Sequence, residues 1–494
     1  MRKSTAIALF FWCLTSATLF AADRAQITPL LRTVDINIGE TITITLCNGK
    51  SATVKLLDVK EPRDDLRQAI REAVVTVEVN GKKTKLVACS YRLPKTVGKV
   101  RIDCAITKGY NSNSSSDSWG LEKDARLRLW PADSPAIRPG TFMYPARQRW
   151  FATDTQMANV PTFVDGGESP ARKSVYYHSG LDIGGAEGLV EVVAATDALV
   201  VSSGLVVLEG HKTGTPVSPR YDVVYLLDAR GWYYRYSHMK EIDKRIVPGR
   251  TVKMGERVGL LGKEGGSGGW SHLHFEAKSR QPSGKWGTQQ GYVFLWEAYL
   301  REHAPQMIAV ARPHRLIWAG EKATLDASRS WSATGKIASY QWKLNDGSKA
   351  VGPKVTRRYK KPGRYSEVVK VTDSAGNIAY DFGIVLVVDK SNPDRIPPAI
   401  HPAFYPTTGI KPGGDVIFKV RTFNTQDGQE TWDFGDGSEP VQVKSDGNAV
   451  KLAKDGYAVT KHRFAKPGDY VVRVERTDSH GVKAVGHLHV RVAE

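Results

Sequence analysis

The sequence has few cysteines and few long apolar runs. Its 494 residues include four cysteines, and none form a Cys-x-x-Cys pair, which argues against a thiolate zinc site or a thiol redox motif. Beyond residue 20, no apolar stretch approaches the about 20 residues that a membrane-spanning helix needs. The basic residues are dispersed, and no nucleic-acid motif accompanies them. These absences argue against a redox protein, a multispan membrane protein and a specific nucleic-acid binder.

The N-terminus has the pattern of a signal peptide. Arg2 and Lys3 form a positive start, Ala6–Phe20 is an apolar core, and Ala21 and Ala22 supply small residues at a cleavage site. We therefore expect residues 1–22 to be removed and the protein to be exported, to the periplasm or outside the cell. The alternative is an uncleaved membrane anchor; after removal we expect no membrane span.

Export permits a disulfide among Cys47, Cys89 and Cys104. Cys89 and Cys104 are the closest pair in sequence, but spacing alone leaves the connectivity open. Three is an odd number, so the sequence also allows one free thiol.

The formal charge of +19 is the strongest compositional signal. A basic exported protein is attracted to polyanions such as bacterial walls and anionic glycans. A basic surface with no specific partner is the alternative.

Residues 23–140 have the pattern of a β-rich domain. Ile42 and its neighbours alternate with polar residues at the strand period of two. Val75–Val79 and Lys82–Val87, joined by Asn-Gly, predict a hairpin with a type I′ turn. Glu61–Ala73 is expected to be a short helix. This region shows no recognisable chemistry.

Residues 141–303 combine short β-type runs with glycine-rich turns. The runs predict an antiparallel β domain, and they are Val190–Ala194, Leu199–Val201, Val223–Leu227 and Trp232–Tyr236. The densest cluster of histidines lies here.

The C-terminal part contains an internal repeat. Trp342-Lys-Leu-Asn-Asp-Gly-Ser matches Trp432-Asp-Phe-Gly-Asp-Gly-Ser, and Pro362-Gly matches Pro467-Gly. We expect two β-sandwiches, at residues 306–390 and 396–494, named here the first repeat and the second repeat. The fold class is therefore mainly β, with several domains.

Three separated pieces carry side chains suited to metal chemistry. His272 and His274 share one face of a strand, so both can point into one cleft. His178 and Asp182 add an imidazole and a carboxylate, which a strand end or bend must bring together. A His₂Asp set with an open fourth position is typical of a catalytic zinc site. The third piece is Tyr236-Ser-His238.

Each motif taken alone is weak. His487-Leu-His489 has the same spacing as His272-Leu-His274, yet no carboxylate motif accompanies it, and we interpret it as structural. The other histidines outside the three pieces are interpreted as surface or packing residues.

Taken together and in order, the motifs resemble the M23 family of zinc metallopeptidases, the lysostaphin-like or LytM-type enzymes. The match runs from about Tyr177 to Ala277. Its motifs are His178-Ser-Gly-Leu-Asp-Ile-Gly, Val193-Ala-Ala, Tyr236-Ser-His-Met, Pro248-Gly with Val252 and Gly255, Val258-Gly-Leu-Leu-Gly, and Ser271-His-Leu-His-Phe-Glu.

The resemblance implies one zinc ion per chain, with His178, Asp182 and His274 as its ligands. His272 and His238 match the two histidines that do not bind metal, one acting as general base and the other stabilising the oxyanion. Such enzymes cut peptide bonds in peptidoglycan, in glycine-containing cross-bridges or stem peptides.

Three further features bear on the site. Glu276, on the face of His274, could orient that ligand, with a surface or packing role as the alternative. Trp270 could line the substrate groove. The Gly210–Arg220 loop resembles an insertion that could reshape the groove.

The two repeats resemble PKD domains, immunoglobulin-like modules of exported enzymes. The resemblance implies spacing, or adhesion to protein or glycan surfaces. For the whole chain, the sequence indicates a secreted zinc endopeptidase acting on peptidoglycan. A non-catalytic wall-binding or hydrolase-activating relative is one alternative, an extracellular protease acting on glycine-rich proteins a second, and a purely adhesive surface protein a third.

Overall fold

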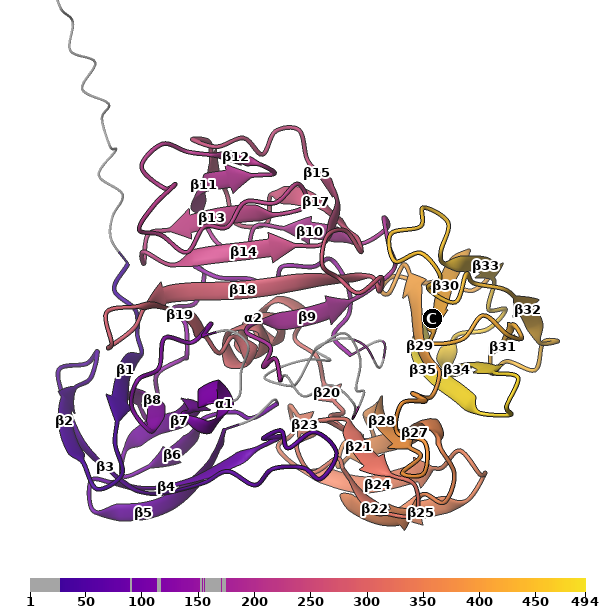
Figure 1. The fold of residues 1–494 in the computed structure, drawn as a ribbon, viewed down its shortest axis with the longest axis horizontal. Helices are drawn as coiled ribbons and strands as arrows, with labels where there is room; N and C mark the ends of the chain where they lie inside the picture. The colour runs from indigo at the N-terminus through magenta and orange to yellow at the C-terminus, as the bar shows by residue number, and fades with distance from the viewer. Residues whose placement is uncertain are drawn as a thin grey trace, which may run out of the picture.

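The computed structural model describes residues 27–88, 91–112, 117–151, 153, 155, 170 and 175–494. Within this part of the chain there are 35 strands and two helices, so the expected mainly β architecture of several domains is confirmed (Figure 1). The predicted signal peptide and Cys89 lie outside the described residues. None of the described helices has the length and apolar character of a membrane span.

Two four-stranded antiparallel sheets form the N-terminal region, with strand orders β2-β3-β4-β5 and β1-β8-β7-β6. The predicted hairpin is present: Asn80 and Gly81 join β4 to β5 with φ angles of 47° and 78°, and a type I′ turn needs both to be positive. The elements are β1 (Arg32–Ile36), β2 (Thr41–Thr45), β3 (Ser51–Lys60), β4 (Ala73–Val79), β5 (Lys82–Ala88), β6 (Lys95–Val97), β7 (Val100–Thr107), α1 (Gly109–Ser112) and β8 (Ala125–Pro131).

The prediction of a short helix over Glu61–Ala73 is wrong. The segment makes one turn, in which the Gln68 amide donates to the Asp64 carbonyl at 3.0 Å. Gln68 then has a φ angle of 57°, and a left-handed residue ends a helix. The Asp64 amide donates instead to the Ala69 carbonyl at 2.9 Å, which closes a loop before β4.

The central region contains an eight-stranded sheet. Its main order is β12-β11-β13-β14-β18-β19, with β16 paired to β11 and β9 paired to β18, and a three-stranded sheet β10-β17-β15 accompanies it. The pairings are antiparallel, as the sequence predicts. The strands are β9 (Leu181–Gly184), β10 (Glu191–Val193), β11 (Ala198–Ser203), β12 (Val206–Val207), β13 (Val224–Asp228), β14 (Tyr233–Ser237), β15 (Met239–Ile242), β16 (Thr251–Val252), β17 (Arg257–Leu261), β18 (His272–Arg280) and β19 (Trp286–Gln289).

The central region also contains α2 (Tyr292–His303), a helix that the β pattern does not predict. Seven of its twelve residues are buried, so the segment lacks a clear polar face and the helical period is hidden. The helix packs in one hydrophobic core with Leu31, Tyr91 and Trp130 from the N-terminal region. The N-terminal sheets and the central region are therefore packed neighbours, and the domain limits 23–140 and 141–303 remain our proposal.

Each C-terminal repeat has its own core, with Trp342 buried in the first repeat and Trp432 at the matching place in the second. The strands of the first repeat are β20 (Met307–Ile308), β21 (Arg315–Trp318), β22 (Lys322–Asp326), β23 (Trp331–Ser332), β24 (Ile337–Lys343), β25 (Lys349–Val351), β26 (Lys354–Arg358), β27 (Gly363–Asp373) and β28 (Ile378–Val388). Those of the second are β29 (Ala399–Tyr405), β30 (Val416–Phe423), β31 (Glu430–Asp433), β32 (Val441–Val443), β33 (Ala458–His462), β34 (Gly468–Thr477) and β35 (Lys483–Val492).

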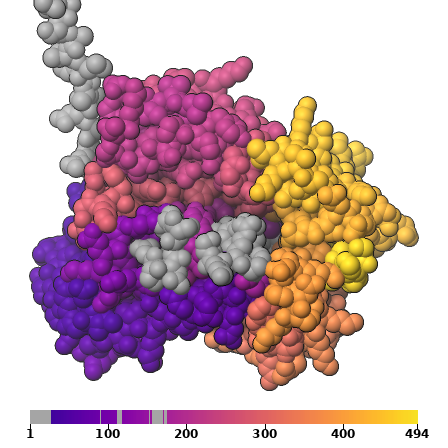
Figure 2. Space-filling model, viewed as in Figure 1, coloured from indigo at the N-terminus to yellow at the C-terminus, as the bar shows by residue number. Residues whose placement is uncertain are grey.

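The two repeats share a sheet. β27 of the first pairs in parallel with β35 of the second, at Arg364 and Ala484, which joins them into one nine-stranded sheet. The space-filling view shows the second repeat, in gold, lying against the central region, in magenta and pink (Figure 2). The contact falls near the start of β18, where the chain enters the strand that carries two of the predicted site histidines.

Candidate metal centre

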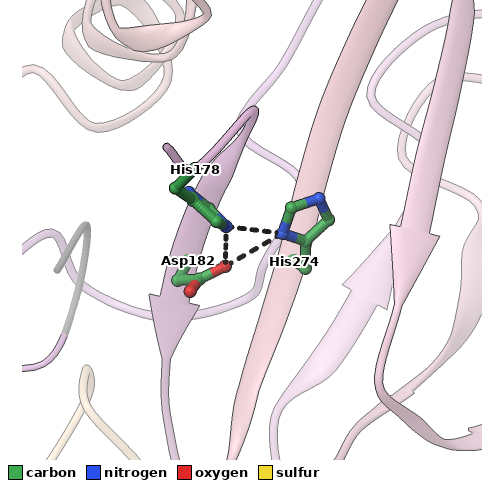
Figure 3. A group of neighbouring side chains, drawn as sticks. All are labelled: His178, Asp182 and His274. Atoms are coloured by element: carbon green, nitrogen blue, oxygen red, sulfur yellow. Dashed lines mark hydrogen bonds and ion pairs between the residues drawn. The ribbon is translucent and has the colours of Figure 1, made fainter. Parts of the chain in front are cut away.

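The side chains of His178, Asp182 and His274 come together across two neighbouring strands (Figure 3). β9 pairs antiparallel with β18, and the register places Asp182 directly opposite His274. His178 lies just before β9. The start of β9 therefore brings His178 and Asp182 next to His274, as the sequence analysis expects of a strand end.

The three side chains present three atoms to one point. His178 Nε2 lies 2.8 Å from His274 Nδ1 and 3.0 Å from Asp182 Oδ1, and His274 Nδ1 lies 3.1 Å from Asp182 Oδ1. Zinc at about 2.0–2.1 Å from each of three tetrahedral ligands would separate them by about 3.3 Å. All three residues are buried, so the donor set fits a single metal ion with little adjustment.

Gly180 explains why the first motif includes glycine. A Cβ atom at this position would lie 2.8 Å from His274 Cε1 and 2.9 Å from the Phe275 carbonyl oxygen. Contacts that short are excluded between packed carbon atoms. Only glycine lets the chain between His178 and Asp182 pass this close to the His274 ring.

The electrostatics of the cluster favour an ionised carboxylate. Burial acts to raise the pKa of Asp182, but the His178 and His272 rings hold that pKa well below its ordinary value. Burial acts to lower the pKa of His274, and its contacts with the Asp182 and Glu276 carboxylates raise it. The site therefore offers one anionic ligand among imidazoles.

Glu276 lies beside His274 on the same strand, and its orienting role stays a prediction. Its Oε2 is 4.0 Å from His274 Nε2, and its Oε1 accepts from the Thr288 hydroxyl at 2.6 Å. Burial acts to raise the pKa of Glu276, but Lys278 and His274 lower it, so the group is a carboxylate. A carboxylate beside Nε2 favours the proton there and leaves Nδ1 free to bind metal.

His272 lies beside the three convergent atoms, with Nε2 3.6 Å from Asp182 Oδ1. Burial holds the pKa of His272 well below its ordinary value, so the ring is neutral at pH 7. Its Nδ1 lies 3.1 Å from the Trp270 carbonyl oxygen. Because a carbonyl only accepts, Nδ1 carries the proton and Nε2 presents a lone pair to the centre.

His238 packs against His272, with ring centroids 4.6 Å apart. It follows β14 and has a φ angle of 68°, a left-handed conformation that histidine adopts more readily than most residues. Its Nδ1 donates to the Glu264 carbonyl at 2.6 Å, so its Nε2 is also unprotonated in the neutral ring. Burial lowers the pKa of His238, against the effect of Asp222.

Asp222 and Arg220 are neighbours of His238 that the sequence analysis did not single out. Asp222 Oδ2 accepts from the His238 amide at 2.9 Å and lies 3.5 Å from its Nδ1. Arg220, the last residue of the expected insertion loop, forms an ion pair with Asp222. A single acid before a strand has no distinguishing pattern, so nothing in the sequence points to it.

Trp270, predicted to line the groove, stacks on His272. The ring centroids are 3.7 Å apart and the planes are inclined by 18°. Trp270 also makes a ring contact with His401 of the second repeat, at 5.4 Å between centroids. The sequence indicates only a surface or packing role for His401, and its position beside the site is a finding of the structure.

The second His-x-His pair is placed differently from the first. His487 is buried beside Ser366 of the first repeat, at 2.8 Å from its hydroxyl, and His489 Nε2 lies 2.6 Å from Asp469. These contacts are those of packed residues at the junction of the repeats.

Two cysteines among the described residues, Cys47 and Cys104, are free thiols. Burial raises the pKa of the Cys104 thiol. Neither belongs to the group of convergent ligands.

The fold and the site define a class: an antiparallel β domain with a buried His₂Asp group capable of holding a metal ion and two further histidines beside it. Residues 176–285 match the model of peptidase family M23, and residues 303–381 and 403–490 each match a PKD domain model. The chain therefore contains an M23-family peptidase domain followed by two PKD domains.

Two curated relatives are collagenases. The chain is 27% identical over 124 residues to a microbial collagenase of Vibrio alginolyticus, and 31% identical over 81 residues to collagenase ColA of Clostridium perfringens. These matches cover 23% and 16% of this chain, and 15% and 7% of the relatives' own lengths.

Similar solved structures include the catalytic domain of the prophage-encoded M23 protein EnpA from Enterococcus faecalis, in a mutant form. It is 22% identical, with 31% of this chain and 93% of that chain covered, at a TM-score of 0.18. Csd3 of Helicobacter pylori is 14% identical, with 53% and 82% covered, at a TM-score of 0.21. The family model assigns the domain.

Proposed function

We propose that the protein is an exported, zinc-dependent endopeptidase that hydrolyses peptide bonds in bacterial peptidoglycan, in stem peptides or cross-bridges. The proposal is carried by the convergence of His178 Nε2, Asp182 Oδ1 and His274 Nδ1 within a domain of a peptidase family. A non-catalytic relative is disfavoured because the metal-binding group and both neighbouring histidines are retained.

The donor set suits zinc in a catalytic site. Two imidazoles and a carboxylate leave a fourth position open, whereas structural zinc sites are closed and commonly use cysteine. Zinc, when bound, acts as a Lewis acid toward the scissile carbonyl and lowers the pKa of water to about 7. Glu276 would hold His274 in the tautomer that binds the ion.

His272 is suited to the role of general base. Its neutral ring directs the Nε2 lone pair toward the metal centre, and the Trp270 carbonyl fixes this tautomer. It takes the proton of the attacking water at Nε2 and returns it to the leaving amine. A base whose pKa lies below the working pH remains unprotonated and available between turnovers.

His238 can stabilise the oxyanion only when its Nε2 carries a proton. Its Nδ1 already donates to the Glu264 carbonyl, so the second proton makes the ring a cation. The Asp222 carboxylate, 3.5 Å from Nδ1, favours that cation. Burial lowers the pKa of His238 overall, so the ring is neutral in the free protein, and the role of Asp222 in the proposal is to offset part of that burial effect when Nε2 gains its proton.

The family domain and the charge support the proposed substrate class. A formal charge of +19 favours anionic polymers, and bacterial walls are such polymers. The PKD domains support binding to a protein or glycan surface and a location outside the cell. The predicted signal peptide supports the same location.

A second candidate is an extracellular protease that acts on glycine-rich proteins. The similarity to two collagenases favours it. Both candidates use the same metal centre, so only the substrate separates them.

The test is digestion of purified peptidoglycan by the zinc-loaded mature protein, with products identified by mass spectrometry and His178→Ala as control. Zinc-dependent release of new peptide ends supports the proposal and identifies the bond. Cleavage of gelatin without release from peptidoglycan supports the second candidate. Cleavage of neither contradicts both.

A further inference from the structure

The second repeat binds residues 268–271, the segment that leads into β18. Four of its side chains form hydrogen bonds with this segment or with the neighbouring Glu187 backbone, at the place where the two bodies meet in Figure 1 and Figure 2. The bonds join Asn448 Nδ2 to the Gly268 carbonyl (3.2 Å), Arg421 Nη1 to the Gly269 carbonyl (2.6 Å), the Ser271 amide to the Tyr457 hydroxyl (2.7 Å) and Lys419 Nζ to the Glu187 carbonyl (2.7 Å).

The buried Tyr457 hydroxyl connects this segment to the interior of the second repeat. It accepts from the Ser271 amide and lies 2.8 Å from His401 Nδ1. Its own proton therefore goes to His401 Nδ1. Burial, together with Arg364 and Arg421, lowers the pKa of His401 to about 3, so the ring is neutral and Nδ1 can accept that proton.

Gly269 shows how tightly the repeat closes on the segment. A Cβ atom here would overlap Asn448 Oδ1 and lie 3.0 Å from Arg421 Nη1. At the adjacent Gly268, a Cβ atom would meet only Trp270 Cδ1, at 3.9 Å. Both glycines have positive φ angles, 73° for Gly268 and 93° for Gly269. The two positions therefore differ in the space that the second repeat leaves.

Trp270 connects the contacts of the second repeat to His272. Its ring contacts both His401 and His272, and its carbonyl accepts from His272 Nδ1. The residues on either side of Trp270 are both held by the second repeat, through Arg421 and Tyr457.

We propose that the second repeat is a structural part of the catalytic site, with Tyr457 and Arg421 as positioning residues for His272. They fix the backbone on both sides of Trp270, and so set the ring stacking and the carbonyl that hold the His272 tautomer. The proposal rests on the proposed function for its catalytic consequence, whereas the orientation of His272 is measurable without activity.

The size of the effect follows from the geometry of general-base catalysis. A displacement of about 1 Å in a catalytic group costs on the order of 100-fold in rate. Loss of the Tyr457 hydroxyl removes the acceptor of the Ser271 amide while leaving the ring in place. We expect kcat to fall about 10- to 100-fold, with KM and zinc content nearly unchanged, because the pairing of β9 with β18 holds Asp182 opposite His274 independently of the second repeat.

The experiment compares full-length Tyr457→Phe with Tyr470→Phe. The Tyr470 hydroxyl bonds to the Lys466 carbonyl at the surface of the same repeat, so its removal is a matched control. For each protein, zinc content, kcat and KM on solubilised peptidoglycan, and the His272 tautomer by ¹⁵N-histidine NMR are measured. His272→Gln assigns the resonance.

We expect Tyr457→Phe to lower kcat and to mix the His272 tautomers, and Tyr470→Phe to match the wild type. Gly269→Ala should also lower kcat and mix the His272 tautomers. Gly268→Ala should show only the backbone strain that an alanine with a positive φ angle causes at either position. An unchanged His272 tautomer, or unchanged kcat with a changed tautomer, overturns the proposal. If the wild type cleaves nothing, the proposed function fails, and the tautomer in these variants alone decides whether the repeat positions His272.

Discussion

Asp182 lies directly opposite His274 across the antiparallel pair of β9 and β18, and its Oδ1 is 3.1 Å from Nδ1 of that histidine. The register of two strands therefore builds the metal centre. A slip by one residue would move Asp182 to the other face of the sheet. Asp182 and His274 are thus positioned by one strand pairing, which suits a preorganised ligand set.

Glu276→Gln should weaken metal binding while preserving the fold. The neutral amide removes the charge that favours the His274 Nε2 proton, and such outer partners are worth about 10- to 100-fold in metal affinity or activity. Zinc affinity, measured by competition with a chelator, should fall in that range. Glu241→Gln, on an exposed residue of the same domain, is the control, and equal affinities in the two variants would contradict the role of Glu276.

Gly180→Ala should displace His274 from the centre. The new methyl group would meet the His274 ring at 2.8 Å, and backbone lies on its other side. We expect loss of stoichiometric zinc and of cleavage. Gly266→Ala is a matched control, since a Cβ atom there would make only an ordinary contact at 3.5 Å. Retention of zinc at wild-type affinity in Gly180→Ala would show that the close approach is not needed.

The junction of the two repeats should lose stability in acid. Burial, and then Arg473, Arg364 and Lys343, lower the pKa of His487 to about 3, against about 6.5 in the unfolded chain. His487 is therefore protonated below about pH 6.5 in the unfolded state, but only below about pH 3 in the folded state. Each pH unit in that window costs about 1.4 kcal/mol, and stability is unaffected above it.

His487→Gln should remove part of this acid sensitivity. Urea unfolding at pH 7.5 and pH 5.0 measures it: the wild type should lose about 2 kcal/mol more than the variant between the two values. His401 and His489 are also buried with lowered pKa values, so the variant should retain a smaller loss. Equal losses in the two proteins would mean that His487 is protonated in the folded state.

The sequence predicts the parts of this structure that depend on local pattern. The Asn80-Gly81 turn follows from the left-handed angles that these residues tolerate, and the strands of the central sheet follow from short runs bounded by glycine. The choice of His178, Asp182 and His274 as one ligand set depends on the resemblance to the M23 family, because His272 and His274 share a strand face and their spacing alone does not say which of them binds metal.

The rest depends on contacts between distant segments, which local pattern does not encode. α2 is buried on most sides and so has no amphipathic period. The turn at Gln68 has an unexpected left-handed residue in a helix-like sequence. His401 looks like any packing histidine, and its place beside Trp270 depends on how the second repeat docks.

The most direct test of the account is to measure zinc content and peptide-bond cleavage together in Asp182→Asn and His272→Ala, with Asp197→Asn, on an exposed residue, as control. We expect Asp182→Asn to lose both zinc and cleavage, His272→Ala to keep zinc and lose cleavage, and Asp197→Asn to keep both. Loss of zinc in His272→Ala, or full cleavage by Asp182→Asn, would contradict the division of the site into three ligands and a base.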